Sequence, residues 1–339
     1  MRLAFLELPA GERKVYIDEA AARRGLAPVI VEKDFWVCWL LGILFQSSFR
    51  DAIVFKGGTS LSKVFGVINR FSEDIDLSLA PAFLGLDEPD TAAALSRGQA
   101  GKWMERAEAK CTEVIRDTLA PEVSAAIEMR LGVAESAWLT FEVDAHSHSP
   151  VLFFHYPTTQ PPALDYLKRS VKLEFGSLTE QRPTGSHGVR PWIADILPDA
   201  FADWRCDVVA LDLHRAFWEK ATILHAEYHR PADKTTPDRF ARHYADTAAL
   251  ALHADASGAI SQSALRDRVV RWKSRFFGSA WARYDLAVSP TFRLVSPPER
   301  ATVLRRDYQA MRDMYLSEPV PFDDVLSTLA DAERQVNEN

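Results

Sequence analysis

The stretch A-I-V-F-K-G-G-T-S-L-S-K-V-F-G-V-I-N-R-F-S-E-D-I-D-L-S-L, from Ala52 to Leu79, decides the fold, because its pattern is strand, glycine turn, helix and strand. The apolar run Ala52–Phe55 stops at Gly57–Gly58, as a buried strand does, and two adjacent glycines let backbone N–H groups approach a ligand closely. Thr59 and Ser60 are expected to cap the helix that follows, whose N-terminus would then attract a phosphate. An apolar stripe predicts that this helix continues to residue 68; its members are Leu61, Val64, Phe65 and Ile68.

The second strand of this stretch carries two aspartates. Its apolar residues alternate with polar ones, so Asp74 and Asp76 share one face, about 7 Å apart along the strand. Neighbouring carboxylates repel each other unless a cation lies between them, and Mg²⁺ prefers one or two carboxylates together with phosphate oxygens. Alone, a glycine pair indicates a turn and an Asp-x-Asp pair a solvated strand face. Together, in this order, they favour metal-assisted nucleotidyl transfer.

The same residues carry a resemblance. The strings G-G-T-S-L-S-K (57–63) and R-F-S-E-D-I-D-L (70–77) resemble the signature of the AbiEii/AbiGii-type nucleotidyltransferase toxins of type IV toxin–antitoxin systems, which include the MenT toxins and belong to the DNA polymerase β-like superfamily. The resemblance implies an NTP substrate, Mg²⁺, the tRNA 3′ end as acceptor and a cognate antitoxin. Asp74 and Asp76 would bind the metal, and Ser72 lies where the family has Ser or Thr beside it. The expected phosphate-binding residues are Gly57, Gly58, Thr59, Ser60 and Lys63.

Composition sets limits on the class of protein. The chain has 339 residues and a net charge of −7, so any nucleic-acid contact must come from a local basic patch. Its longest apolar run, Phe35–Phe45, is too short to span a bilayer. Three scattered cysteines, Cys38, Cys111 and Cys206, lack metal-binding spacing and indicate reduced thiols. We therefore expect a cytoplasmic protein without membrane contact.

The first fifty residues predict two helices, Glu12–Arg24 and Val31–Phe45. The second opens with Glu32, Lys33 and Asp34, and the string E-K-D-F-W resembles the family's N-terminal segment. Alternatively, these charges cap and solvate a packing helix.

Val171–Gly176 is the second stretch with chemistry, because its alternation places Lys172 and Glu174 on one strand face. An exposed edge strand would show the same pattern. In the resembled family, a lysine here is essential, and it would neutralise charge that develops on the triphosphate. The third carboxylate is either Glu174 or Asp195, the latter on a predicted hairpin strand, 191–197, after a turn at 181–188. Glu174 is slightly preferred because its strand is more certain.

The second half of the chain is predicted to be helical from residue 212. The string R-A-F-W-E-K-A-T-I-L-H (215–225) resembles a family segment, so Glu219 and Lys220 would line the nucleotide cleft, or else form a local ion pair. Arg242 and Asp246 lie in R-H-Y-A-D, which resembles the family's late Arg…Asp motif with altered spacing. A nucleotide contact and a structural ion pair both remain open for them.

The segment Arg266–Arg283 is rich in basic residues interleaved with Trp272, Phe276, Phe277 and Trp281. This composition is typical of RNA-binding surfaces, although the same charges would also fit the solvent-exposed face of an amphipathic helix.

The sequence therefore predicts an α/β (α+β) protein: a nucleotidyltransferase core with a mixed β-sheet flanked by helices in residues 1–210, and an all-helical domain in residues 211–339. NTP and Mg²⁺ would bind in the cleft between them. The alternatives are a nucleotidyltransferase acting on a protein or small molecule, and a non-catalytic NTP-binding module.

Overall fold

The computed structural model describes residues 4–87, 96–145, 147–161, 168–202 and 204–339. The chain divides into two compact units. Unit 1 holds Met1–Val64, Ser72–Asp87 and Arg106–Ala210, and unit 2 holds Phe65–Phe71, Glu88–Glu105 and Leu211–Asn339.

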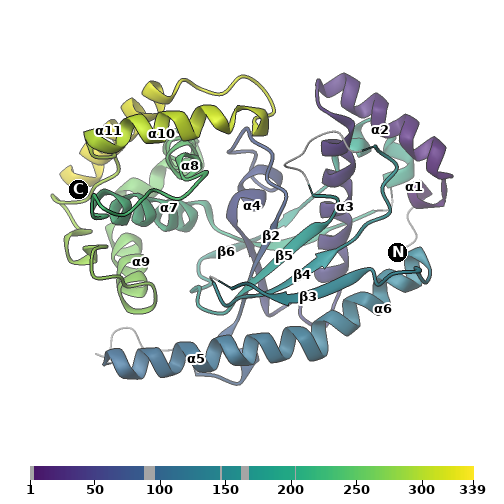
Figure 1. Cartoon of the computed structure of the whole chain (residues 1–339), viewed down its shortest axis with the longest axis horizontal. Helices are drawn as coiled ribbons and strands as arrows, with labels where there is room; N and C mark the ends of the chain where they lie inside the picture. The colour runs from purple at the N-terminus through teal and green to yellow at the C-terminus, as the bar shows by residue number, and fades with distance from the viewer. Residues whose placement is uncertain (1–3, 88–95, 146, 162–167, 203) are drawn as a thin grey trace. The chain divides into compact units, whose positions relative to one another are not determined.

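Unit 1 is built on a mixed sheet, which confirms the predicted α+β class (Figure 1). In the described residues the sheet has seven strands in the order β3-β4-β5-β2-β1-β7-β6. β2 lies at its centre, antiparallel to β1 and parallel to β5, while β1 runs parallel to β7. The strands are β1 (Ile53–Lys56), β2 (Ile75–Leu79), β3 (Leu139–Val143), β4 (Pro150–Phe154), β5 (Val171–Gly176), β6 (Thr184–Gly188) and β7 (Asp207–Leu211).

The α-helices of the described residues occur in both units. They are α1 (Ala4–Glu7), α2 (Ala10–Arg24), α3 (Pro28–Leu44), α4 (Gly57–Lys63), α5 (Arg97–Val114), α6 (Ala120–Leu131), α7 (Leu213–Tyr228), α8 (Ala241–Leu252), α9 (Ser263–Phe276), α10 (Pro298–Ala310) and α11 (Phe322–Glu338). In the part of the chain that the structure describes, no helix is both long and apolar enough to cross a membrane.

The apolar face of the sheet forms the core of unit 1, with α3 lying across it (Figure 1). Ile75, Leu77 and Leu79 of β2 are completely buried, as their alternation predicts. The ring of Phe154 on β4 packs against Trp36 and Trp39 of α3 at centroid distances of 5.7 and 5.6 Å. One side of the sheet is thus sealed, which leaves the polar positions of β2 and β5 on the other.

Helix α4 is shorter than its apolar pattern predicts, and it begins earlier. It starts at Gly57, so Thr59 and Ser60 lie inside the helix and do not cap it. It ends at Lys63, and Gly66 then adopts a left-handed φ of 64°. Beyond this point the backbone N–H of Phe71 donates to the carbonyl of Met314 instead of to a helical partner. The helix therefore stops short of the predicted residue 68, and from residue 69 the chain pairs with a distant segment.

The predicted strand at 191–197 is wrong. Trp192–Asp195 form a 3₁₀ turn, and the strand β6 occupies part of the segment predicted as a turn. Two consecutive residues, Ile193 and Ala194, are buried, which a strand with one covered face does not allow. The N–H of Trp192 donates to the Asp34 carboxylate at 2.7 Å, which holds this turn against α3.

Candidate active site

Four charged side chains of unit 1 come together on the face of the sheet opposite to α3. Asp76 on β2 lies directly across from Glu174 on parallel β5, and directly across from Lys56 on antiparallel β1. Residues opposite each other in register project to the same face. Lys172 precedes Glu174 by two positions and so shares this face. The strand register thus gathers two acids and two lysines at the centre of the sheet.

Gly57 lies against Asp76, and this contact explains why glycine occupies the position. Its φ is +78°, in the left-handed region that side chains avoid. A β-carbon placed on Gly57 would lie 2.0 Å from Oδ2 of Asp76. The glycine turn therefore makes room for the aspartate, a role that its sequence pattern alone does not indicate.

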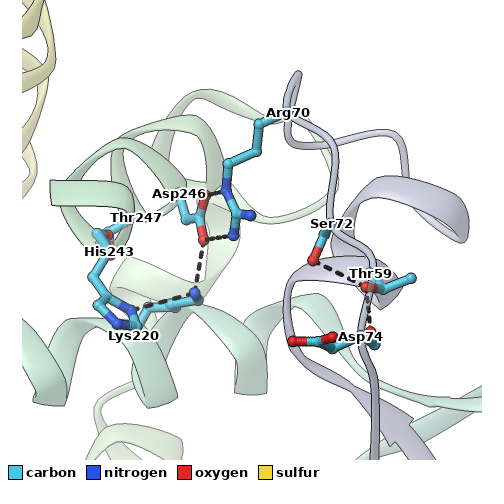
Figure 2. Close-up of polar contacts among 8 residues, drawn as sticks. All are labelled: Thr59, Arg70, Ser72, Asp74, Lys220, His243, Asp246 and Thr247. Carbon is cyan, nitrogen blue, oxygen red and sulfur yellow. Dashed lines mark hydrogen bonds and ion pairs between the residues drawn. The ribbon is translucent and has the colours of Figure 1, made fainter. Parts of the chain in front are cut away.

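Thr59 fixes the entry to β2, as Figure 2 shows. Its hydroxyl lies 2.9 Å from Oγ of Ser72 and donates to the backbone carbonyl of Asp74. Because Thr59 is completely buried, its hydroxyl has no access to a ligand from solvent. The threonine therefore aligns Ser72 and Asp74 with the first turn of α4.

Lys172 and Glu174 form an ion pair, with Nζ 2.7 Å from Oε2. Burial alone would lower the pKa of Lys172, but the hydrogen bond and charge of Glu174, with the charge of Asp74, raise it above its usual value. Lys172 is therefore a full cation beside the aspartates. The pKa of Asp74 is itself raised, by burial first and then by the Glu73 carboxylate, against the lowering effects of Lys172 and Lys33.

The aspartate pair offers the donor set that Mg²⁺ prefers. Asp74 and Asp76 are both partly exposed, and their carboxylate oxygens are hard ligands suited to this ion. Among the described residues, no group of three or more His, Cys, Asp or Glu side chains is arranged to hold a metal. Glu174, which lies opposite Asp76 in the strand register, is bonded to Lys172. Two carboxylates completed by substrate phosphates match the usual coordination of Mg²⁺.

The model of one protein family, the nucleotidyl transferase AbiEii toxin of type IV toxin–antitoxin systems, matches residues 39–328. The chain belongs to the AbiEii family. Among solved structures, MenT4, a nucleotidyltransferase toxin from Mycobacterium tuberculosis H37Rv, is similar at 15% identity, over 87% of this chain and 99% of that one, with a TM-score of 0.37. A comparison with curated proteins gave no match. The predicted family, and with it the nucleotidyltransferase toxin class, is confirmed.

In this AbiEii protein, Lys63 is placed differently from the prediction. Its side chain is 7% exposed, its Nζ lies 2.5 Å from Oδ1 of Asp34, and the ring of Trp192 covers it at 4.7 Å. Gly58 and Ser60, two further predicted phosphate contacts, are also buried. Gly57 is partly accessible, whereas Lys63 is partly accessible as a residue but its side chain is buried. We therefore leave Lys63 out of the proposed site.

Asp195 lies apart from the aspartate pair in its interactions. Its side chain is 66% exposed and bonds to Arg24 of α2. Since Glu174 faces Asp76 across the sheet and Asp195 is not on a strand, the geometry favours Glu174 between the two sequence candidates.

In unit 2, Asp246 is the centre of a buried ion triad (Figure 2). Arg70 binds both of its carboxylate oxygens, at 2.9 and 2.8 Å, and Lys220 donates to it at 2.7 Å. Asp246 is 1% exposed. Burial would raise its pKa, but the two cations lower the pKa far below the ordinary value. Arg242, one turn earlier on α8, is partly exposed. The triad supports the structural interpretation of Lys220 and Asp246.

Glu219 takes part in a second ion cluster within unit 2. Its carboxylate lies 2.8 Å from Arg215 and 2.7 Å from Lys273. Burial would raise the pKa of Glu219, yet Lys273 and Arg215 lower it to about 2. Glu219 joins α7 to α9, so the local ion pair describes its contacts better than a ligand-binding role.

Helix α9 carries the basic segment, and its aromatic residues are not all available for stacking. Trp272 and Phe276 are 3% and 2% exposed and pack in the core of unit 2, which contradicts their expected role as platforms for bases. Phe277 is exposed, whereas Trp281 lies 4.6 Å from the guanidinium of Arg230. The remaining features that suit RNA are the accessible arginines Arg268, Arg271 and Arg275.

Two residues beside the site escaped the sequence analysis as candidates. Lys33 of α3 is completely buried and bonds to Glu73, the residue just before Asp74. Lys56 faces Asp76 from β1. The string E-K-D-F-W was the available signal for Lys33, but a charged triplet at the start of a helix predicts solvation, and here all three side chains are buried.

Proposed function

We propose that this chain transfers a nucleotide from an NTP to the 3′ end of tRNA in the cytoplasm, with Mg²⁺ as cofactor, and so arrests growth under the control of a cognate antitoxin. The observation that carries the proposal is the arrangement of Asp76, Lys172 and Glu174 on one face of β2 and β5, with Asp74 directly before β2. Carboxylates for a metal and a cation for a triphosphate are what nucleotidyl transfer requires.

Each residue has a proposed role. Asp74 and Asp76 hold Mg²⁺, which when bound orients the triphosphate and neutralises its charge. Lys172 donates to the triphosphate oxygens as their charge increases during transfer. Glu174 holds the Lys172 ammonium in place by the 2.7 Å hydrogen bond and serves as the third carboxylate. Gly57 keeps the Asp76 carboxylate in position and offers the accessible backbone of the glycine turn to a phosphate.

The choice of tRNA depends on the accessible arginines of α9 and on the toxin class. Lysine and arginine contacts to phosphates make RNA binding depend on salt. The proposal does not use the two buried aromatics of the segment, since they cannot stack on bases.

The test of function uses purified protein, each labelled NTP and total RNA. We expect label to enter tRNA, and we expect Asp74→Ala and Asp76→Ala to abolish incorporation while the thermal unfolding midpoint stays the same or rises, because carboxylate repulsion is removed. Wild-type turnover in either variant would remove the metal role from that aspartate.

The acceptor is tested separately by replacing Arg268, Arg271 and Arg275 with glutamate. The variant should bind tRNA more weakly, and the log–log salt slope should fall by about 0.7 to 0.9 for each lost phosphate contact. NTP binding should not change. Full transfer activity in the triple variant would instead indicate a protein or small-molecule acceptor.

A further inference from the structure

The start of α3 places three consecutive charged residues in the core of unit 1, and we propose that the middle one, Lys33, is a positioning residue for Asp74. It holds Glu73 on the α3 side of the sheet and thereby fixes the peptide that presents the Asp74 carboxylate on the opposite side. This inference rests on the proposed function, because it concerns the metal-binding pair of that site.

The contacts of Lys33 are few and specific. The residue is 1% exposed, and its ammonium bonds to Oε2 of Glu73 and donates to the backbone carbonyl of Lys168 at 2.8 Å. Glu73 is next to Asp74, and Lys168 lies four residues before Lys172. One buried cation therefore joins the segment before β2 to the segment before β5, which are the two strands that carry the proposed site.

The position of Glu73 explains why it needs this partner. Glu73 lies just before β2, and its bond to Lys33 places its carboxylate against α3, which covers the apolar side of the sheet. A carboxylate on an apolar side must be paired or move to water. Without Lys33, Glu73 would turn towards solvent and rotate the peptide that it shares with Asp74.

The neighbours of Lys33 act on other segments of the same site. Glu32 accepts hydrogen bonds from the N–H and hydroxyl of Thr159 at 2.5 and 2.7 Å, in the chain that leads to β5. Asp34 binds Lys63 at the end of α4 and the N–H of Trp192. Because consecutive helix positions differ in direction by about 100°, three adjacent charges reach three different segments. Only Lys33 reaches the residue beside the metal-binding pair.

The experiment compares Lys33→Met, Lys33→Arg and the double variant Lys33→Met/Glu73→Gln with wild type. The control is Lys110→Met, which removes a lysine from an exposed ion pair with Glu113 on α5. Binding of Mn²⁺ is measured by electron paramagnetic resonance, and kcat and KM for NTP are measured on the same samples. We expect Lys33→Met to weaken Mn²⁺ binding and to lower kcat by about 10- to 100-fold, as the loss of a residue that supports a metal ligand does, with a smaller effect on KM. Lys33→Arg should recover part of the Mn²⁺ binding and part of kcat, and Lys110→Met should have the same Mn²⁺ binding and kcat as wild type.

The double variant separates positioning from simple charge compensation. It leaves no uncompensated charge, so we expect its thermal stability to recover, while Mn²⁺ binding and kcat stay reduced because nothing ties the side chain at position 73 to α3. Recovery of both stability and kcat would overturn the inference, since Lys33 would then only neutralise Glu73. If Lys33→Met does not fold, the double variant decides alone.

Failure of the proposed function gives a different result. A wild-type protein that binds Mn²⁺ but incorporates no nucleotide contradicts the function, and the loss or retention of Mn²⁺ binding in the double variant still decides the role of Lys33. A wild-type protein that does not bind Mn²⁺ overturns both.

Discussion

Replacing Gly57 by alanine tests the link between the glycine turn and the proposed metal-binding pair, Asp74 and Asp76. The residue has a φ of +78°, and its new β-carbon would lie 2.0 Å from Oδ2 of Asp76, whereas real contacts of this kind stay above 3.0 Å. The carboxylate must therefore move by about 1 Å or more, a displacement that can reduce catalysis about 100-fold. The left-handed backbone alone costs an alanine about 1–2 kcal/mol.

Gly25 provides a matched control for the backbone cost. It has a similar φ of +66°, and nothing lies within 4 Å of a β-carbon placed on it. We expect Gly25→Ala to lose about 1–2 kcal/mol of unfolding free energy in urea and to keep its nucleotidyl transfer activity. Gly57→Ala should lose at least as much stability and about 100-fold in kcat. If Gly57→Ala keeps wild-type kcat with the stability loss of the control, the position of Asp76 does not matter for transfer and the metal assignment fails.

Six further variants test the charged groups. Lys172→Ala and Lys172→Arg should each lose about 100-fold or more in kcat, because a planar guanidinium does not replace the ammonium. Glu174→Gln should lose more transfer activity than Asp195→Asn. Equal losses of activity in these two variants would remove the third-carboxylate role from Glu174. Asp246→Asn should lower the unfolding free energy by about 3–5 kcal/mol, since two buried cations lose their partner. A rise in KM for NTP without loss of stability would instead support a nucleotide contact for Asp246. Glu219→Gln should remove a pH dependence: the pKa of Glu219 is lowered to about 2, so its stabilisation is present above about pH 4.5 and is lost as the pH falls towards 2. Urea unfolding of the wild-type and Glu219→Gln proteins at pH 7 and pH 3 measures this pH dependence. Equal losses of unfolding free energy in the two proteins at pH 3 would contradict the role of the Glu219 charge.

The sequence correctly predicted the strands whose positions depend on local periodicity. The alternation in β2 and β5 and the apolar run of β1 placed the central strands correctly, because one covered face requires a period of two. It failed at 191–197, where a backbone N–H bonds to a buried carboxylate of α3, and at the end of α4, where the chain pairs with residues near 314. Both features depend on partners more than 100 residues away in the chain. No periodicity reports such contacts.

The candidate site shows the same division between local and distant information. The alternation within β5 is enough to show that Lys172 and Glu174 share one face. The choice between Glu174 and Asp195, in contrast, required the pairing register of β2 with β5. The triplet at residues 32–34 shows why buried charges are harder to predict. From the sequence alone, water is the partner that solvates an ion at the lowest free-energy cost, so three adjacent charges indicate a solvent-exposed first turn of the helix. Burial becomes favourable only when a specific counter-charge or hydrogen-bond partner is already in place for each ion, and here Glu73, Lys63 and Thr159 provide those partners from three separate segments. A buried ion pair is a poor source of stability compared with apolar packing, so the pair of Lys33 with Glu73, next to the aspartates proposed to bind the metal, argues for a positioning role rather than for a stabilising one.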